Sequence, residues 1–383
     1  MASHGNNLKV PPGATELEVS VFGPGFGECI VLHLGYNDWA VVDSCLDIAS
    51  KKPAALRYLN LLGVDPAKSV RLVVATHWHD DHMQGLAKVL EAASGAVFAC
   101  SGAVREPEFK EVLAAWTGAR ALPGGSGIDE LRSIMVELKR RTTDSRCVAP
   151  RLAGAGKTLW PIAGKPNPHA ISVKSLSPSD AAVLATVSRL KGLGTIAAKS
   201  RRRLPNLLEN DTSVVLSVEA GTHKVLLGGD LHVRADRSFG WLAIVDDCRG
   251  IDARHDVFKV PHHGSQTGDH EEIWSTLAKE QPCAVATPFV DGRVRLPSVA
   301  DCQRILTKTR IAFLSAPPVP GRFRDSSKTV EKTVQEATLS VQSVPGKYGH
   351  VRLRKLLGDS PGTPWRVELF GSAVTMADYA SKL

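Results

Sequence analysis

The sequence predicts a mixed α/β fold, and three observations lead to that prediction. Short strands, either β-branched or alternating between apolar and polar residues, recur from residue 16 to residue 287. Several of these strands run into segments with helical periodicity, and polar residues gather where strands end. The two halves of this region have a similar order of strands and helices. We therefore expect strands that feed helices, with functional side chains at the strand ends.

The individual elements follow from local periodicity and from turn residues. In the first half, the predicted strands are 16–22, 29–33, 39–42 and 70–75, and the predicted helices are 53–62 and 83–93. In the remainder, the predicted strands are 170–176, 213–219, 224–227, 256–260, 284–287, 311–314, 350–355 and 365–370, and the predicted helices are 128–141, 181–190, 271–279 and 299–306. The basic stretch 192–206 is predicted to be an exposed loop.

The length of the chain sets the domain organisation that we expect. Its 383 residues exceed what a single core usually absorbs. Residues 1–290 are predicted to form the main domain, in which 101–209 is an insertion-like middle segment with weaker signals. Residues 291–383 form a C-terminal extension that either completes the main sheet or makes a module of its own.

Composition narrows the class of protein. Hydrophobic residues make up 43% and charged residues 22%, which is ordinary for a globular chain and argues against disorder. Seven cysteines are scattered singly, so we expect reduced thiols rather than disulfides or a zinc knuckle. The start is polar, and no segment approaches the roughly 20 apolar residues that span a bilayer, so a cytoplasmic protein is expected. The net charge of +8 is compatible with an anionic partner, such as nucleic acid, a nucleotide or an anionic lipid surface, but many basic proteins bind none of these.

Four candidate metal ligands lie in one run between a predicted strand and a predicted helix, namely His77, His79, Asp81 and His82. Imidazole and carboxylate are the usual ligands of zinc and related metals. Two histidines two positions apart on extended backbone can reach one metal, and an Asp-His pair at the turn into the helix can reach a second. A single histidine there would be ordinary polar surface, but four such residues at this spacing favour a metal site.

Two later strand ends add to this set. Asp230 follows the strand 224–227 and two glycines, and its carboxylate could bridge two metal ions about 3.5–4 Å apart. His262 and His263 follow the strand 256–260, where adjacent side chains diverge. We expect His263 to be the metal ligand and His262 to face the substrate, where it could donate a proton or contact a phosphate. The reverse assignment stays open.

These motifs resemble those of the metallo-β-lactamase superfamily. The run HWHDDH is similar to its HxHxDH signature, and LLGGD and KVPHHGS resemble its later metal-binding strand ends. The opening VFGPGFGECIVLHLGYNDWAVVDS is similar to the first hairpin of one branch, which holds the hydrolase domain of DNA-uptake competence proteins and the choline-phosphate esterases. The resemblance spans roughly residues 16–287. It implies an αββα sandwich, two divalent ions (Zn²⁺, or else Mn²⁺) and hydrolysis.

Carried over by position, the resemblance gives each of these residues a place. It implies His77 and His79 as ligands of the first metal, Asp81 and His82 as ligands of the second, Asp230 as the bridge and His263 as the last histidine. Asp43 matches an aspartate near the site whose role is to orient a ligand.

The sequence departs from the family pattern at two positions. Many members supply a further histidine to the first metal, just before the strand that here begins at residue 213. This chain has Glu209-Asn210-Asp211 there, which leaves Asp211, Asn210 or the distant His169 to fill the position. The histidine that competence-type domains often carry before a later proline is also replaced, in the stretch 293–297.

The predicted reaction follows from the metals and from charge. Two metal ions lower the pKa of a bridging water, which Asp81 would hold while His262 assists the leaving group. This chemistry suits phosphodiesters, esters, lactones and amides alike. Basic residues at 139–141 and at Arg201, Arg202 and Arg203 could bind phosphates. We therefore expect a phosphodiesterase, acting as a nuclease on DNA or RNA first and on cyclic or small nucleotides second.

Two alternatives belong to other classes. An ester, lactone or thioester hydrolase prefers an apolar substrate pocket, and the basic middle segment counts against it. A non-catalytic or partner-activated subunit would dock to another protein through residues 288–383, and assembly with further copies of the chain is also open. The complete run of candidate ligands argues against the non-catalytic version.

Overall fold

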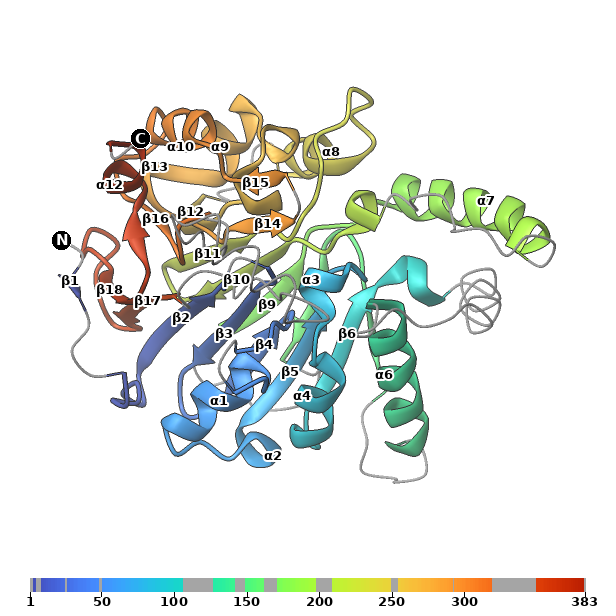
Figure 1. Cartoon of the computed structure of the whole chain (residues 1–383), viewed down its shortest axis with the longest axis horizontal. Helices are drawn as coiled ribbons and strands as arrows, with labels where there is room; N and C mark the ends of the chain where they lie inside the picture. Colours follow the sequence, from blue (N-terminus) through green and yellow to red (C-terminus); the bar gives the residue numbers. More distant parts are fainter. Residues whose placement is uncertain are drawn as a thin grey trace, which may run out of the picture.

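The computed structural model describes residues 3–4, 8–24, 26–47, 50–105, 127–141, 149–161, 171–197, 209–248, 254–291, 293–318 and 349–381. Two large sheets pack face to face, and helices cover the outer face of each (Figure 1). The predicted mixed α/β class and the αββα sandwich are therefore confirmed.

The first sheet is built mainly from the amino-terminal half. Its strands, in spatial order, are β1 (Ser3–His4), β18 (Arg366–Gly371), β17 (Gly349–Leu356), β2 (Glu16–Phe22), β3 (Cys29–Leu34), β4 (Trp39–Val42), β5 (Val70–Ala75), β6 (Val97–Ser101) and β7 (Arg151–Ala153). The strands β4, β5 and β6 run parallel, so their carboxyl ends meet at one edge of the sheet.

The second sheet has the same arrangement at its centre. Its strands, in spatial order, are β19 (Val374–Thr375), β16 (Ala312–Leu314), β13 (Ala278–Ala286), β12 (His255–Lys259), β11 (His223–Leu227), β10 (Leu216–Ala220), β9 (Ile171–Ser175) and β8 (Lys157–Trp160). The strands β11, β12, β13 and β16 run parallel. A separate hairpin pairs β14 (Phe289–Asp291) with β15 (Val294–Leu296). Strands from beyond residue 291 thus lie in both sheets.

The helices form the two outer layers. On the first sheet lie α1 (Ala54–Leu61), α2 (Pro66–Ser69), α4 (Leu86–Ala92) and α6 (Gly127–Arg141), and on the second lie α8 (Gly240–Asp247), α9 (Glu271–Leu277), α10 (Val299–Leu306) and α12 (Met376–Ser381) (Figure 1). The helix α7 (Asp180–Ala197) extends away from the sheets at the right of the view (Figure 1). None of the described helices is both long and apolar enough to cross a membrane.

Alternate side chains of a strand belong to different cores, one between the two sheets and one beneath the outer helices. In β3, Ile30 and Leu32 point between the sheets, whereas Val31 points to the helices that cover the first sheet. In β11, Val225 contributes to the core between the sheets and Leu226 to the core beneath the outer helices. Because both faces are buried, these strands are apolar almost throughout, as strands at the centre of a layered α/β fold usually are.

Three predicted elements differ from those observed, each for a local reason. The predicted helix 83–93 is divided into a short α3 (Asp80–Met83) and α4, because Gly85 between them adopts a left-handed φ of 78°. The helix predicted over 181–190 continues to Ala197 and takes in part of the predicted loop, since glycine weakens a helix without forbidding it. The strand β13 begins at Ala278, inside the predicted helix 271–279. The helix α8, the strand β6 and the hairpin β14–β15 were not predicted.

Candidate metal centre

The candidate ligands converge because four parallel strands end at the same side of the sandwich. Asp43 follows β4, and the run from His77 to His82 follows β5. Asp230 follows β11, and His263 follows β12. Ligand and substrate sites of layered α/β folds commonly lie at such carboxyl ends.

One group of four side chains meets at the centre. Single ligand atoms of Asp81, His82, Asp230 and His263 all lie within 4.8 Å of one another, and all four residues are buried. Within the group, His263 Nε2 lies 3.0 Å from Asp81 Oδ2 and 3.5 Å from Asp230 Oδ2. His82 Nε2 lies 3.5 Å from Asp81 Oδ2 and 3.4 Å from Asp230 Oδ1.

A second group of Asp43, His77 and His82 adjoins the first and shares His82 with it. The Asp43 residue adopts a left-handed φ of 58°, and its carboxylate accepts hydrogen bonds from the Thr76 amide at 2.7 Å and the Thr76 hydroxyl at 2.6 Å. His82 Nδ1 lies 2.7 Å from the same carboxylate and donates to it. This bond fixes the ring so that Nε2 faces Asp81 and Asp230, as a carboxylate behind a ligating histidine does.

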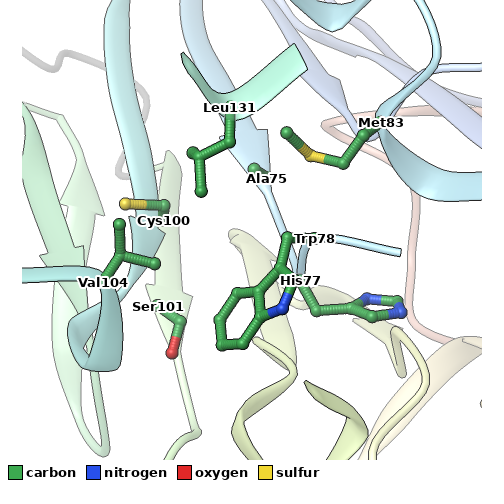
Figure 2. Close-up of a pocket in the computed structure, with 8 residues that line it drawn as sticks. All are labelled: Ala75, His77, Trp78, Met83, Cys100, Ser101, Val104 and Leu131. Carbon is green, nitrogen blue, oxygen red and sulfur yellow. The ribbon is translucent and has the colours of Figure 1, made fainter. Parts of the chain in front are cut away.

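The alternation of the motif explains how the histidines are presented. On extended backbone, successive side chains point to opposite sides. The Trp78 side chain packs into the core beneath the helices, where it lines a small cavity of about 10 Å³ together with Met83 and Leu131. Figure 2 shows that the His77 imidazole is directed away from these apolar side chains. The tryptophan thus anchors the run, and the two histidines beside it have ring centres 4.7 Å apart.

The donor set fits a divalent cation. His77 Nε2, His82 Nε2 and Asp230 Oδ1 are buried and have no hydrogen-bond partner among the described residues. A buried polar atom left without a partner costs roughly 1–3 kcal/mol, so three such atoms in two adjoining groups of candidate ligands call for a bound group. Imidazole nitrogens and carboxylate oxygens at this spacing suit zinc or manganese, and the cluster could therefore hold such ions.

Electrostatics favour a cation at the same point. Burial alone would lower the pKa of His82, but the carboxylates of Asp230, Asp81 and Asp43 outweigh burial and hold that pKa well above its usual value. Burial would raise the pKa of Asp230, yet His82 and His263 hold it well below its usual value. The Asp230 carboxylate is therefore anionic at neutral pH, and its charge attracts a positive ion.

A buried ion pair supports His263 through Thr287, and neither of its two residues was identified from the sequence. The Lys259 ammonium lies 2.5 Å from Glu28 Oε2, and both side chains are fully buried. The Thr287 hydroxyl donates to the same Glu28 oxygen at 2.5 Å, and its own oxygen lies 3.0 Å from His263 Nδ1, which donates to it. Lys259 also donates to the Gly229 carbonyl at 3.3 Å, directly before Asp230. One ion pair thus supports two strand ends of the centre.

His262 and His263 diverge, as expected for adjacent residues at a strand end. Both adopt left-handed φ angles, and their ring centres lie 6.4 Å apart. His262 Nδ1 lies 3.2 Å from Nε2 of His232, a residue that the sequence analysis did not single out. Burial first, and His232 among the further causes, lowers the pKa of His262 to about 4. A ring that is neutral at pH 7 is better suited to hydrogen bonding than to donating a proton.

The position of the missing first-metal histidine is occupied by Asn210 and Asp211. Asp211 accepts from Arg234 at 2.7 Å and is engaged in that ion pair. The Asn210 amide nitrogen lies 3.1 Å from His232 Nε2, while Asn210 Oδ1 is buried and has no partner among the described residues. His169 lies outside the described residues. Of the two alternatives that the structure describes, Asn210 offers an oxygen that no described residue engages, whereas one Asp211 oxygen is taken by Arg234.

The first-metal histidines are less closely gathered than the rest. His77 is buried and its ring centre lies 4.7 Å from that of His79, which is only partly buried. His79 belongs to neither group of ligand atoms that meet within 4.8 Å among the described residues.

Two basic stretches were predicted to bind phosphates, and the structure describes only one of them. Arg201, Arg202 and Arg203 lie outside the described residues. In the stretch 139–141, Arg141 is buried, pairs with Glu137 at 2.9 Å, and donates to carbonyls at the end of α4 and just beyond it, namely Leu90, Ala93 and Ala96. Arg140 also binds Glu137, at 2.7 Å, and together the two arginines, Arg140 first, lower the pKa of Glu137 to about 2. The expectation that 139–141 forms a phosphate-binding patch is wrong for Arg141, which caps a helix instead.

The chain has no match among curated proteins but is similar to several solved structures. Among solved structures, the chain is similar to the metallo-beta-lactamase fold protein YhfI from Bacillus subtilis, with 12% identity, a TM-score of 0.32, and coverage of 64% of this chain and 70% of that one. It is similar to a metallo-beta-lactamase with a HARLDQ motif from Cronobacter sakazakii, with 15% identity, a TM-score of 0.33, and coverage of 63% and 76%.

The family model settles the assignment. The model of the metallo-beta-lactamase superfamily matches residues 22–282, which include every strand end that carries a candidate ligand. With its αββα sandwich and its buried aspartates and histidines at that end of the sheets, this chain belongs to the metallo-β-lactamase superfamily.

Proposed function

We propose that this protein is a metal-dependent phosphodiester hydrolase that acts on nucleic acid or nucleotides. The observation that carries the hydrolase part is the buried group of Asp81, His82, Asp230 and His263, whose ligand atoms face one another. Two divalent ions, Zn²⁺ or else Mn²⁺, would supply an activated water and would stabilise the negative charge that develops during attack.

The proposed roles of the residues are to bind the two ions, to orient the ligands and to hold the attacking water. The proposed ligands are His77, His79 and Asn210 for the first ion, Asp81, His82 and His263 for the second, and Asp230 between them. Asp43 and Thr287 would orient their histidines through the hydrogen bonds at 2.7 Å and 3.0 Å. Asp81 would also hold the attacking water in place by accepting a hydrogen bond from it.

A polar wall beside the centre supports a phosphodiester rather than an apolar acyl group. His232 and His262 meet there, with His232 Nε2 3.2 Å from His262 Nδ1. Burial first, and the charge of the nearby Arg234 second, lower the pKa of His232. Nitrogen donors of this kind suit phosphate oxygens, and a guanidinium suits them best. The net charge of +8 and the proposed contribution of Arg201, Arg202 and Arg203 point to the same class of substrate.

An ester or lactone hydrolase is the second candidate, and one observation favours it. Phe26 and Phe289 are partly exposed next to the centre, with ring centres 5.7 Å apart, and an apolar acyl group could lie against them. The two candidates differ in the bond that is cleaved, so a choice of substrates separates them.

The test compares substrates and two neighbouring aspartates. Metal-loaded protein is assayed on bis-p-nitrophenyl phosphate, p-nitrophenyl acetate and a lactone. Asp81→Asn should lower phosphodiester cleavage by more than about 100-fold, because even groups behind a ligand are worth 10–100-fold. Asp80→Asn serves as the matched control, since Asp80 is exposed and its carboxylate accepts from the Gly127 amide at 2.6 Å. Cleavage of the esters alone, or full activity of Asp81→Asn, would overturn the proposal.

A further inference from the structure

Two aromatic side chains, one from a turn of the first sheet and one from the separate hairpin β14–β15, meet beside the candidate metal centre. Phe26 lies in the turn between β2 and β3 of the first sheet, and Phe289 begins β14 after the second sheet. Their ring centres lie 5.7 Å apart at an interplanar angle of 38°, and both side chains are partly exposed. The Phe289 ring also lies 5.2 Å from the His263 ring, at 32°. Large aromatic side chains are mostly well buried, so a partly exposed pair at a site needs a reason.

The turn that carries Phe26 is fixed against the centre. Gly27 has a φ of 102°, and a Cβ there would meet the Cys45 Cβ at 2.6 Å and the Asp81 carbonyl oxygen at 3.1 Å, so the turn requires glycine. The Glu28 amide donates to that same carbonyl at 2.9 Å. The turn is also tied to the second sheet, because the Ser315 hydroxyl donates to the Gly23 carbonyl at 3.3 Å. These contacts fix the backbone of the turn that carries Phe26.

Phe289 is placed by its hairpin and by the residues before it. The register pairs Phe289 with Leu296, so these two side chains share one face of the hairpin. Val290 and Arg295 form the next pair and lie on the other face. Thr287, two residues earlier, is bound to both His263 and Glu28, which ties the start of the hairpin to the metal centre.

The two sides of the centre thus differ in chemistry. On one side, His262 leads to the polar wall formed with His232. On the other, His263 leads to Phe289 and Phe26. A phosphodiester has two ester groups, so a phosphate held at the centre would direct one group toward each side.

We propose that Phe26 and Phe289 form a stacking site for the nucleobase of the substrate. The inference rests on the proposed phosphodiesterase function and names its substrate class. A base is joined to its phosphate through one sugar, so a stacking ring has to lie near the centre, as Phe289 does at 5.2 Å from the His263 ring. Aromatic faces stack on every base, which predicts binding of nucleotides without sequence preference.

Two substrates with the same leaving group test this inference. Thymidine 5′-(p-nitrophenyl phosphate) and methyl p-nitrophenyl phosphate contain the same scissile bond, and only the first carries a base. Phe289→Leu should raise KM for the thymidine substrate by about 5- to 100-fold, the range expected for one lost stacking contact, and should leave KM for the methyl substrate unchanged. Phe26→Leu should act in the same direction. Val294→Ala, at an exposed position of the same hairpin, is the control and should change neither value.

Binding measured without turnover separates this inference from the proposed function. In calorimetric titrations of the metal-loaded protein, thymidine 5′-monophosphate should bind more tightly than methyl phosphate, and Phe289→Leu should remove that difference. Such a preference without cleavage of either substrate would keep the stacking site and overturn the phosphodiesterase. Cleavage of both substrates with equal KM, unchanged in Phe289→Leu, would overturn the stacking site alone. Equal losses on both substrates would also overturn it, because the ring would then be needed only for packing.

Discussion

Asp43→Asn is a nearly isosteric change behind one candidate ligand, and the structure predicts its effect on metal binding. The carboxylate accepts three hydrogen bonds, from the Thr76 amide at 2.7 Å, the Thr76 hydroxyl at 2.6 Å and His82 Nδ1 at 2.7 Å. Position 43 has a left-handed φ of 58°, which asparagine tolerates as well as aspartate does. The backbone is therefore not strained by the change, and its effect comes from the hydrogen bonds.

The magnitude follows from the number of donors that face this side chain. An amide offers one oxygen, so its NH₂ group must face either the Thr76 amide or His82 Nδ1. If it faces Thr76, a buried N–H loses its acceptor at a cost of roughly 1–3 kcal/mol. If it faces His82, the ring has to carry its proton on Nε2, the atom that would bind the metal. Either way we expect metal affinity to fall by about 10- to 100-fold, the effect typical of groups behind a ligand.

The assay is competition for Zn²⁺ or Mn²⁺ with a chromophoric chelator, on variants whose fold is checked by circular dichroism. Asp256→Asn is the matched control, because Asp256 is also buried and hydrogen-bonded, to the Lys224 amide at 2.9 Å and Lys279 at 2.8 Å, but lies at the other end of β12. The metal affinity of Asp256→Asn should stay within about threefold of that of the unchanged protein, which is well below the 10-fold loss that is the least expected for Asp43→Asn. A folded Asp43→Asn protein with unchanged affinity would refute the reasoning, as would an equal loss in the control.

Two further predictions concern stability. The buried His350 ring stacks on Phe22 at 4.2 Å and on Phe370 at 5.3 Å, and burial, ahead of two nearby arginines, holds its pKa well below the usual value. Below about pH 6.5, His350 binds a proton in the unfolded chain but not in the folded one, so the unchanged protein loses stability as pH falls. The free energy of unfolding of His350→Phe, measured with denaturant, should therefore rise relative to that of the unchanged protein by about 1.4 kcal/mol per pH unit. A difference that does not change with pH would contradict this. Lys259→Met should destabilise the protein by about 3–5 kcal/mol, because it leaves Glu28 charged and buried without its partner. Adding Glu28→Gln should recover most of that stability, and a double variant no more stable than Lys259→Met would contradict this prediction.

The sequence could place most of the candidate ligands close together because their signal is local. His77, His79, Asp81 and His82 lie in one run after an apolar strand, and Asp230 and His263 follow strands of the same kind. Parallel strands bring their carboxyl ends to one edge, so position along the chain is enough to place these residues together. The predicted fold class succeeded for the same reason, since buried strands alternate with helices along most of the matched region.

The supporting residues could not be predicted because their contacts depend on tertiary packing. Lys259 lies in a predicted strand, but a lysine there is normally taken as exposed, and its partner Glu28 is 231 positions away. Arg141 belongs to a basic stretch that periodicity places at the end of a helix, and only the packing of α6 on α4 shows that it is buried. Phe289 belongs to a hairpin of two three-residue strands, which is too short to give a periodic signal.

The most direct test of the account is a count of bound metal. The purified protein is loaded with Zn²⁺ or Mn²⁺, dialysed, and analysed for metal per chain, alongside Asp230→Asn. We expect about two ions per chain, as a two-metal site requires, and about one or none in Asp230→Asn. The Asp230 carboxylate, which that variant lacks, lies 3.4 Å from His82 and 3.5 Å from His263. A folded protein that retains no metal, or an Asp230→Asn variant that retains both ions, would contradict the account.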